Sequence, residues 1–279
     1  MSTPTTTPAT TATTTATTAG TTRAQVTGAA ARLRALGRAE FTLLLRNRSA
    51  LFVAVLLPVL MVGSIRSSLA EVDLSDIGLS AAGAAVTGGI GMALLMVVHA
   101  NLVAAFVARR EGLVLKRLRT GEPRDLEILT GIALPAAALT VAQCVLLSVG
   151  GVTVLGLGAP TRPLLLIAGV LLGIVLLTAI AAATSAVTRT VESAQLTTLP
   201  LLLVSIFGSG LFFPISILPD RIAALCELLP LTGVMTLVRA GWSGTVEPAD
   251  LALAALAAVV WIALSAYAVR RWFRWDPRR

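Results

Sequence analysis

Six long apolar runs, almost free of charge, constrain the fold of this chain more than any other feature. They lie at about 50–67, 83–108, 130–157, 163–187, 195–213 and 249–269. Each run is long enough to cross roughly 30 Å of hydrocarbon as a helix. The 279 residues are 56% hydrophobic and only 13% charged, a composition that soluble domains rarely have. We therefore predict an all-α membrane protein with six transmembrane helices.

The basic residues are divided unevenly between alternate connections of this predicted topology. If the N-terminus lies inside, 18 of the 22 Arg and Lys residues fall in cytoplasmic segments. The outer side keeps only Arg66, Arg162, Arg221 and Arg239. Cytoplasmic connections of membrane proteins carry an excess of Arg and Lys, so we predict that both termini are cytoplasmic. The net charge of +8 then suits anionic lipid headgroups, and we expect no nucleic-acid partner.

The N-terminal 48 residues form two segments ahead of the predicted transmembrane domain. Residues 1–27 are rich in Thr, Ala and Pro, and we predict a disordered cytoplasmic tail. Residues 28–48 combine an apolar side with several arginines, which predicts an amphipathic helix in the membrane interface. Residues 49–270 form the predicted transmembrane domain, and 271–279 form a basic, aromatic cytoplasmic tail. The apolar side of the interfacial helix is made by Leu33, Leu36, Phe41 and Leu44.

Residues 208–248 are too polar and too rich in proline for a simple span, yet too apolar for a free loop. Pro214, Pro219 and Pro230 divide this segment into short pieces. We predict two short re-entrant helices that dip into the outer leaflet and pack against the protein. The alternative is a seventh span over 222–241, which would carry Glu227 and an arginine into the bilayer. That alternative would also reverse the C-terminal tail, against the distribution of basic residues.

Sequence motifs for catalysis and for metal binding are absent. The only lysine, Lys116, follows Leu115 and not the glycine of a phosphate-binding loop. One histidine and two isolated cysteines supply neither an HExxH motif nor the usual ligands of a structural zinc ion. We therefore expect no catalytic residue, no metal and no cofactor on this chain, so that any chemistry comes from a partner.

Two polar residues, His99 and Asn101, lie inside the second apolar run. Polar groups within a membrane are costly and are functional candidates for that reason. Two helical residues turn by about 200°, so these side chains should point to nearly opposite faces. His99 is either a packing residue or a substrate or proton site, and we favour packing.

The segment "RREGLVLKRLRTGEPRDLEIL", residues 109–129, concentrates charge between two apolar runs. An apolar stripe of Val114, Leu115 and Leu118 lies among its basic residues, and Gly121 and Pro123 mark a helix end and a new start. A simple membrane anchor needs basic residues but neither a stripe nor four acids. The mixture predicts a cytoplasmic docking surface for a soluble partner.

Three stretches make the chain resemble the membrane subunit of ABC-2-type exporters, in particular the actinobacterial daunorubicin-resistance-like permeases. "RREGLVLKRLRTGEP" resembles the family's first cytoplasmic loop, although Gly121 and Glu122 stand where the family often has Thr-Pro. "SGLFFPISILPDRIAALCELLPLTGVMTLVR" resembles the segment before the last span, and "RRWFRWDPR" resembles the tail. The resemblance covers about residues 30–279.

This resemblance implies a multi-pass protein of the bacterial cell membrane that acts in drug efflux or antibiotic resistance. Two copies of a separate ATP-binding subunit, which bind ATP and Mg²⁺, would dock on a coupling helix in the first cytoplasmic loop. A second permease, identical or related, would complete the transporter. Carried over from the family, the coupling positions are Arg110, Glu111, Gly112, Leu115, Lys116, Arg117, Leu118 and Arg119.

The substrate class implied is a hydrophobic or amphipathic compound such as a drug, an antibiotic or a lipid. A polysaccharide exporter is the nearest rival, but its aromatic-rich path is not evident in a chain with 4% aromatics. An inverted repeat and buried carboxylates would indicate a secondary transporter, and we find neither in the sequence. A membrane scaffold that transports nothing is a further alternative, and only the resemblance of the coupling loop argues against it.

Overall fold

The computed structural model describes residues 81–115, 124–211 and 219–273, together with a few single positions before residue 68. All of the regular structure in these ranges is helical. The helices are α3 (Ala81–Ala93), η2 (Leu94–Ala100, a π-helix), α4 (Asn101–Glu111), α6 (Asp125–Thr153), α7 (Pro163–Val187), α8 (Val191–Gly208), α9 (Asp220–Glu227), α10 (Pro230–Ser243) and α11 (Pro248–Trp272).

Five helices of the described chain are long and apolar enough to cross a membrane, which confirms the all-α membrane fold. The first of them is continuous through α3, η2 and α4, over Ala82–Glu111. The others are α6, α7, α8 and α11. Together the five match the second to sixth predicted runs within a few residues. The predicted first span at 50–67, the interfacial helix at 28–48 and the N-terminal tail lie outside the described ranges.

Local sequence explains where most of these helices begin. Proline occupies the first turn of α7, α10 and α11, where its missing N–H would have had no partner within the helix. At α8 the Thr190 hydroxyl accepts a hydrogen bond from the Ser193 amide over 3.2 Å. At α6 the Glu127 carboxylate accepts from the Arg124 amide, also over 3.2 Å.

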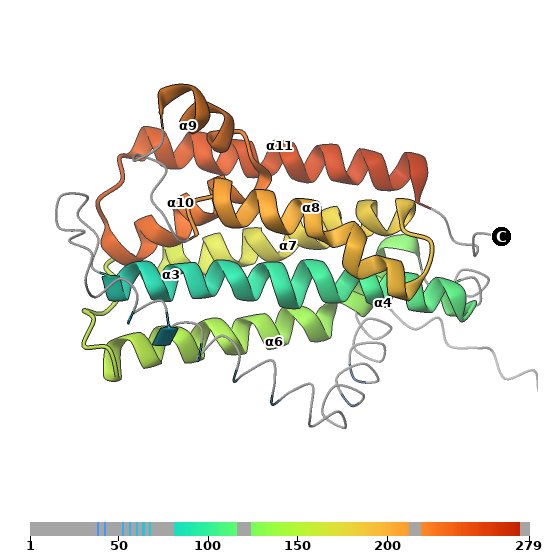
Figure 1. Cartoon of the computed structure of the whole chain (residues 1–279), viewed down its shortest axis with the longest axis horizontal. Coiled ribbons are helices and arrows are strands. Elements are labelled where there is room, and N and C mark those ends of the chain that lie inside the picture. Colours follow the sequence, from blue (N-terminus) through green and yellow to red (C-terminus); the bar gives the residue numbers. More distant parts are fainter. Residues whose placement is uncertain are drawn as a thin grey trace, which may run out of the picture.

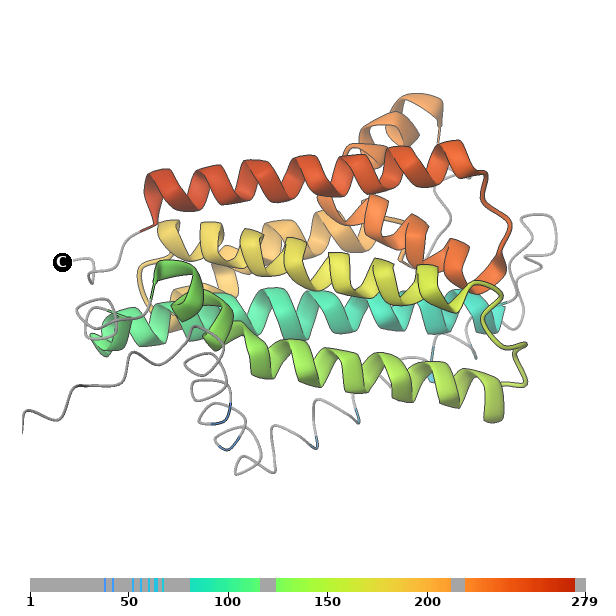
Figure 2. The same ribbon diagram turned by 180° about the vertical axis from the view of Figure 1, so that it is seen from behind.

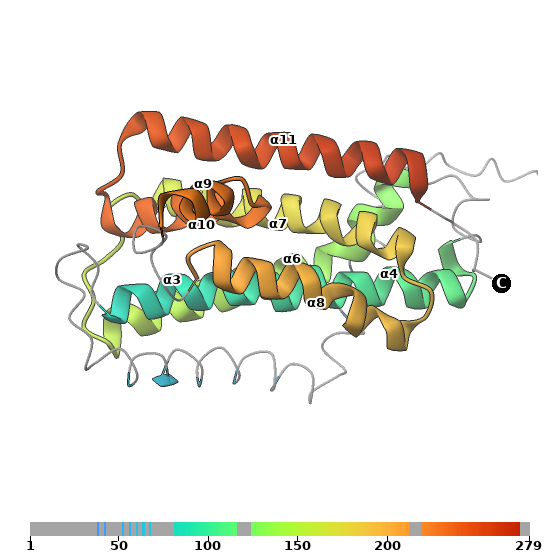
Figure 3. The ribbon, with the colours of Figure 1, turned by 45° about the horizontal axis from the view of Figure 1, so that its top comes forward.

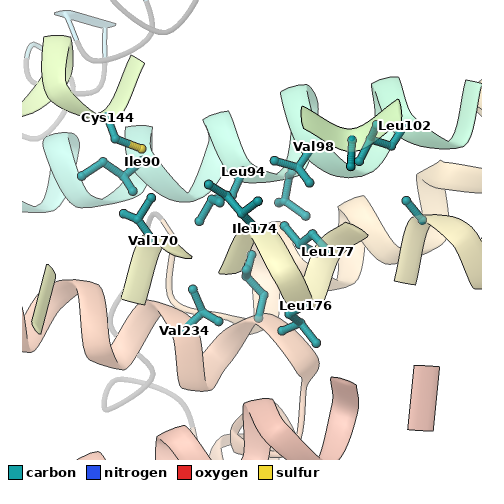
Figure 4. Close-up of a cluster of buried hydrophobic side chains, with 14 of the residues drawn as sticks. Ile90, Leu94, Val98, Leu102, Cys144, Val170, Ile174, Leu176, Leu177 and Val234 are labelled. Carbon is teal, nitrogen blue, oxygen red and sulfur yellow. The ribbon is translucent and has the colours of Figure 1, made fainter. Parts of the chain in front are cut away.

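The helices run side by side along the long axis of the molecule (Figures 1 and 2). α7 lies in the middle and contacts α10, α11, α4 and η2. Buried aliphatic side chains of the α3–η2–α4 span, such as Leu94 and Val98, meet Ile174 and Leu177 of α7 (Figure 4). Small residues allow close approach: a Cβ on Gly241 of α10 would lie 2.5 Å from the Leu166 amide nitrogen of α7.

The bundle has two ends, which we name by the arginines described below. At the Arg110 end α4, α7 and α11 finish, and α6 and α8 begin. The rings of Phe106 in α4 and Phe273, just after α11, meet there with centroids 6.4 Å apart. At the Arg239 end α3, α7 and α11 begin, and α6, α8 and α10 finish. There the Arg162 amide donates to the Gly241 carbonyl over 3.0 Å.

The segment between α8 and α11 is re-entrant and does not form a seventh span. α9 and α10 meet at an angle of 87° (Figure 3). α8 finishes at the Arg239 end, where Arg239 of α10 bonds to the Gly210 carbonyl over 3.1 Å. α11 begins at this same end, so the connecting segment enters and leaves on one side. The predicted helix break at Pro230 is the first turn of α10, and Pro219 precedes α9.

Candidate functional site

The connection between α4 and α6, which we predicted to be cytoplasmic, begins with a sharp bend at the end of α4. The Gly112 amide donates to the Ala108 carbonyl over 2.9 Å, and the Leu113 amide donates to the Arg110 carbonyl over 3.1 Å. Leu113 has φ 57°, the left-handed conformation that usually belongs to glycine at a helix end. A residue with a Cβ costs about 1–2 kcal/mol there. The helix that was predicted to end at Gly121 is therefore already broken at 112–113, and helix resumes at Val114.

Arg110 is the largest fully buried side chain in the described chain, with 1% of its surface exposed. Its Nη1 donates to the Ser185 carbonyl over 2.8 Å. Its Nη2 donates to the Thr188 carbonyl and, over 3.4 Å, to the Arg189 carbonyl. These acceptors lie at the C-terminus of α7 and in the turn after it.

The chemistry of a helix end explains why a buried arginine is stable at this position. The last carbonyls of a helix have no partner within it, and they carry the negative end of the helix dipole. The guanidinium group supplies several fixed donors and a full positive charge. Arg110 thus links the end of α4 to the α7–α8 turn, two segments that are 75 or more residues apart in sequence. The loop that follows α4 is therefore tied to the end of α7 by these hydrogen bonds.

The predicted coupling residues divide into an outward-facing and an inward-facing set. Glu111 and Gly112 are exposed, as is Leu113 beside them. Arg110 and Leu115 are buried, and Leu115 belongs to the apolar core. Lys116, Arg117, Leu118 and Arg119 lie outside the described residues, as do Leu33, Leu36, Phe41 and Leu44 of the predicted interfacial helix.

His99 and Asn101 occupy the two sides of the second span. His99 is wholly buried in the π-helix η2, whereas Asn101 is exposed. Among the described residues, neither ring nitrogen of His99 has a hydrogen-bond partner. π-helical turns within α-helices are frequent at functional sites. Sequence analysis did not single out three further buried polar side chains without such a partner, although each is a polar residue inside an apolar run: Gln143, Ser205 and Ser209.

A second arginine, Arg239 of α10, caps α8 at the opposite end of the bundle. Its Nη1 donates to the Gly210 carbonyl over 3.1 Å, and its Nε donates to the Met235 carbonyl in its own helix over 3.2 Å. Gly210 follows the end of α8 with φ 69°. A Cβ on this glycine would lie 2.5 Å from Nη1 of Arg239. In the predicted re-entrant region, Glu227 is exposed and Pro230 is buried, while Pro214 lies outside the described ranges.

Comparison with protein families identifies the family to which this chain belongs. The model of the ABC-2 type transporter family matches residues 31–242, which is most of the chain. The chain is an ABC-2 type transporter permease. The matched region includes the α4 end with Arg110 and the re-entrant pair α9 and α10. No curated protein is similar enough to the chain to count as a match.

The family assignment identifies a transport subunit. Across the residues that the structure describes, no three His, Cys, Asp or Glu side chains gather as a metal site would require. The features that stand out are a bend at the start of the α4–α6 connection, a buried link from that bend to α7, and the bent helix pair α9 and α10.

Proposed function

We propose that this ABC-2 type permease is the membrane subunit of an ATP-driven exporter. It moves a hydrophobic or amphipathic compound, such as a drug, an antibiotic or a lipid, out of the cell. Family membership supports the permease role. The resemblance of "RREGLVLKRLRTGEP" and of the C-terminal tail to daunorubicin-resistance-like permeases supports the export direction and the substrate class. A separate subunit binds and hydrolyses ATP with Mg²⁺.

The observation that carries this proposal is the link from Arg110 to α7. An ATP-binding subunit that docks on residues 110–119 would contact exposed groups such as Glu111 and Leu113. The buried Arg110 guanidinium would then pass the movement of that loop to the carbonyls of Ser185 and Thr188. Docking and transmission are thus assigned to neighbouring residues with opposite exposure.

The arrangement of arginines supports an orientation in which the Arg110 end is cytoplasmic. Between residues 81 and 273, the described arginines at that end outnumber those at the Arg239 end by six to three. An excess of basic residues marks the cytoplasmic side of a membrane protein. The six are Arg109, Arg110, Arg124, Arg189, Arg270 and Arg271, and the three are Arg162, Arg221 and Arg239.

The complete transporter, in this proposal, contains two permeases and two ATP-binding subunits. Affinity purification of the permease from native membranes in a mild detergent tests it directly, with mass spectrometry of the co-purifying chains and an ATPase assay. We expect a stoichiometric ATP-binding subunit, and a second permease sequence would identify a heterodimer. A preparation without any ATPase, even after crosslinking, would overturn the proposal in favour of a scaffold or a secondary transporter.

A further inference from the structure

An apolar groove of about 730 Å³ runs between α7, α8 and α11. Ala183 of α7, Leu201 and Val204 of α8, and Leu264 of α11 are among its walls. Most of the lining residues are aliphatic, aromatic or proline. Thr184 and Ser265 are the two that carry an aliphatic hydroxyl group. The groove is therefore suited to hydrocarbon and offers little to a polar ligand.

We call the end of the groove at the α9–α10 bend the closed end, and the end at Trp272 the open end. Leu229 and Pro230, at the bend between α9 and α10, line the closed end. The indole N–H of Trp261 donates to the Leu228 carbonyl over 2.9 Å and fixes α11 to this bend. Trp272 lines the groove at the last residue of α11, at the Arg110 end of the bundle. The bend thus limits how far a ligand can extend from the Arg110 end.

The length of the groove matches one leaflet of a bilayer. Eleven residues separate Trp261 from Trp272, and at 1.5 Å per helical residue they span about 16 Å. The hydrocarbon core of a bilayer is about 30 Å thick, so one leaflet contributes about 15 Å. Tryptophan is enriched at the level of lipid headgroups, which is where Trp272 would lie. An extended acyl chain from the adjacent leaflet has this length.

Charge at the open end indicates the headgroup. Arg271 is seven residues after Leu264 and three after Ala268, so its spacing places it on the groove-lining face of α11. Arg270 and Arg189 are exposed at the same end of the bundle. The exposed acids that the structure describes there are Glu192 at the start of α8, Glu111 at the end of α4 and Asp125 at the start of α6, so arginines remain in excess. Arginine at the membrane surface attracts anionic headgroups and can bind a phosphate through two parallel hydrogen bonds.

We propose that this groove binds one acyl tail of an anionic phospholipid, with the phosphate held at Arg271. The tail occupies the space between α8 and α11, and the bend at Leu228–Pro230 stops it near the middle of the membrane. This site requires the chain to be in a membrane but not that it be an exporter. Its test and the test of the proposed function can therefore fail separately.

Fluorescence quenching of Trp261 by brominated lipid tails tests the site. The full-length chain would carry Trp242→Phe, Trp272→Phe and Trp275→Phe, so that Trp261 is the only tryptophan left. Nanodiscs of phosphatidylcholine would contain a rising fraction of brominated phosphatidylglycerol or, in parallel, of brominated phosphatidylcholine. We expect the anionic lipid to reach half-maximal quenching at a severalfold lower fraction.

Three variants, one of them a control, connect lipid binding to named residues. Arg271→Gln should reduce the preference for the anionic lipid about fivefold, the effect of removing one basic residue near a membrane surface. Arg162→Gln, at the other end of the bundle, is the matched control and should leave the preference unchanged. Ala183→Leu should fill part of the groove and weaken quenching by both lipids.

Three outcomes would overturn the proposal. Equal quenching by the two lipids would show only the ordinary surrounding lipid. An unchanged preference in Arg271→Gln would place the headgroup elsewhere. Absence of quenching in a dimeric preparation would show that a second copy covers the groove. Native mass spectrometry of the unmutated chain provides an independent measurement, in which we expect one retained phosphatidylglycerol per chain.

Discussion

The two ends of the bundle each contain an arginine that caps a neighbouring helix, but the two are held differently. Arg110 is 1% exposed and donates to three carbonyls of another segment, at Ser185, Thr188 and Arg189. Arg239 is partly exposed and makes one such bond, to Gly210, and one within its own helix. The contacts that hold the Arg110 end are therefore more numerous and better shielded from solvent.

This difference indicates which end transmits movement and which end yields. Each hydrogen bond to a charged group contributes about 1.5–3 kcal/mol, so three bonds hold more firmly than one. We infer that α4 and the α7–α8 turn move together, whereas α10 separates from α8 more readily. In an exporter driven from the cytoplasm, this arrangement would transmit movement of the cytoplasmic loop to α7. The opposite end of the bundle, where α10 meets α8, would be free to open.

The largest expected contrast between the ends is their accessibility from the two sides of the membrane. Cysteine would replace Glu111 or Arg270 at the Arg110 end, and Glu247 at the Arg239 end, after Cys144 and Cys226 are changed to Ala. All three positions are exposed. An impermeant maleimide added to intact cells should label position 247 alone. Labelling of all three positions, or of 111 without 270, would contradict the proposed orientation.

Loss of Arg110 should produce the next largest effect. Arg110→Gln leaves the α7 carbonyls with fewer donors, and we expect the free energy of unfolding in detergent to fall by about 3 kcal/mol. Arg109→Gln removes the same charge from the adjacent, less buried position and is the matched control, with an expected change below about 1 kcal/mol. Equal losses in the two variants would show that charge alone, and not the link to α7, matters here.

Disturbing the contact between Arg239 and Gly210 should lower the free energy of unfolding less than the loss of Arg110 does. Gly210→Ala places a Cβ at φ 69° and against the Arg239 guanidinium, whose flexible end can shift away. We expect a loss of about 1–2 kcal/mol, mainly from the backbone conformation. Gly156→Ala also has positive φ, 66°, but meets nothing within 4 Å, so it isolates the backbone contribution. A loss at position 210 as large as that of Arg110→Gln would remove the distinction between the two ends.

The smallest expected effect is a gain at the bend after α4. Leu113→Gly relieves the left-handed conformation of Leu113 and should raise the free energy of unfolding by up to about 1 kcal/mol. Leu113→Ala keeps the Cβ and should give no such gain. Thermal unfolding in detergent distinguishes the two variants. A destabilised Leu113→Gly would show that the leucine side chain contributes more by its contacts than its backbone costs.

The sequence was sufficient for the five spans that the structure describes and for the break between α9 and α10, because membrane helices have a strong compositional signal. Long apolar runs located five helices within a few residues, and proline with charge located the break at Pro230. Both signals are local, since each depends on residues adjacent in the chain.

Sequence analysis named Arg110 as a coupling residue by resemblance, but it could not find the buried contacts of Arg110, because they are made with residues distant in sequence. Next to Arg109 and Glu111, Arg110 looks like one more charge at a membrane boundary. Only the packing of α4 against α7 reveals a buried link. The left-handed Leu113 was equally unpredictable, because glycine next to it is the residue that usually marks such a bend.

The most direct test of the account measures transport and ATP hydrolysis together. Wild-type permease, Arg109→Gln, Arg110→Gln and Arg110→Lys would each be reconstituted with the ATP-binding subunit in proteoliposomes. Lysine keeps the charge but lacks the planar fork that reaches several carbonyls. We predict that both Arg110 variants still bind the subunit and hydrolyse ATP, while transport per ATP falls at least about tenfold, as expected for a lost coupling free energy. Unchanged transport per ATP in folded Arg110 variants would contradict the account.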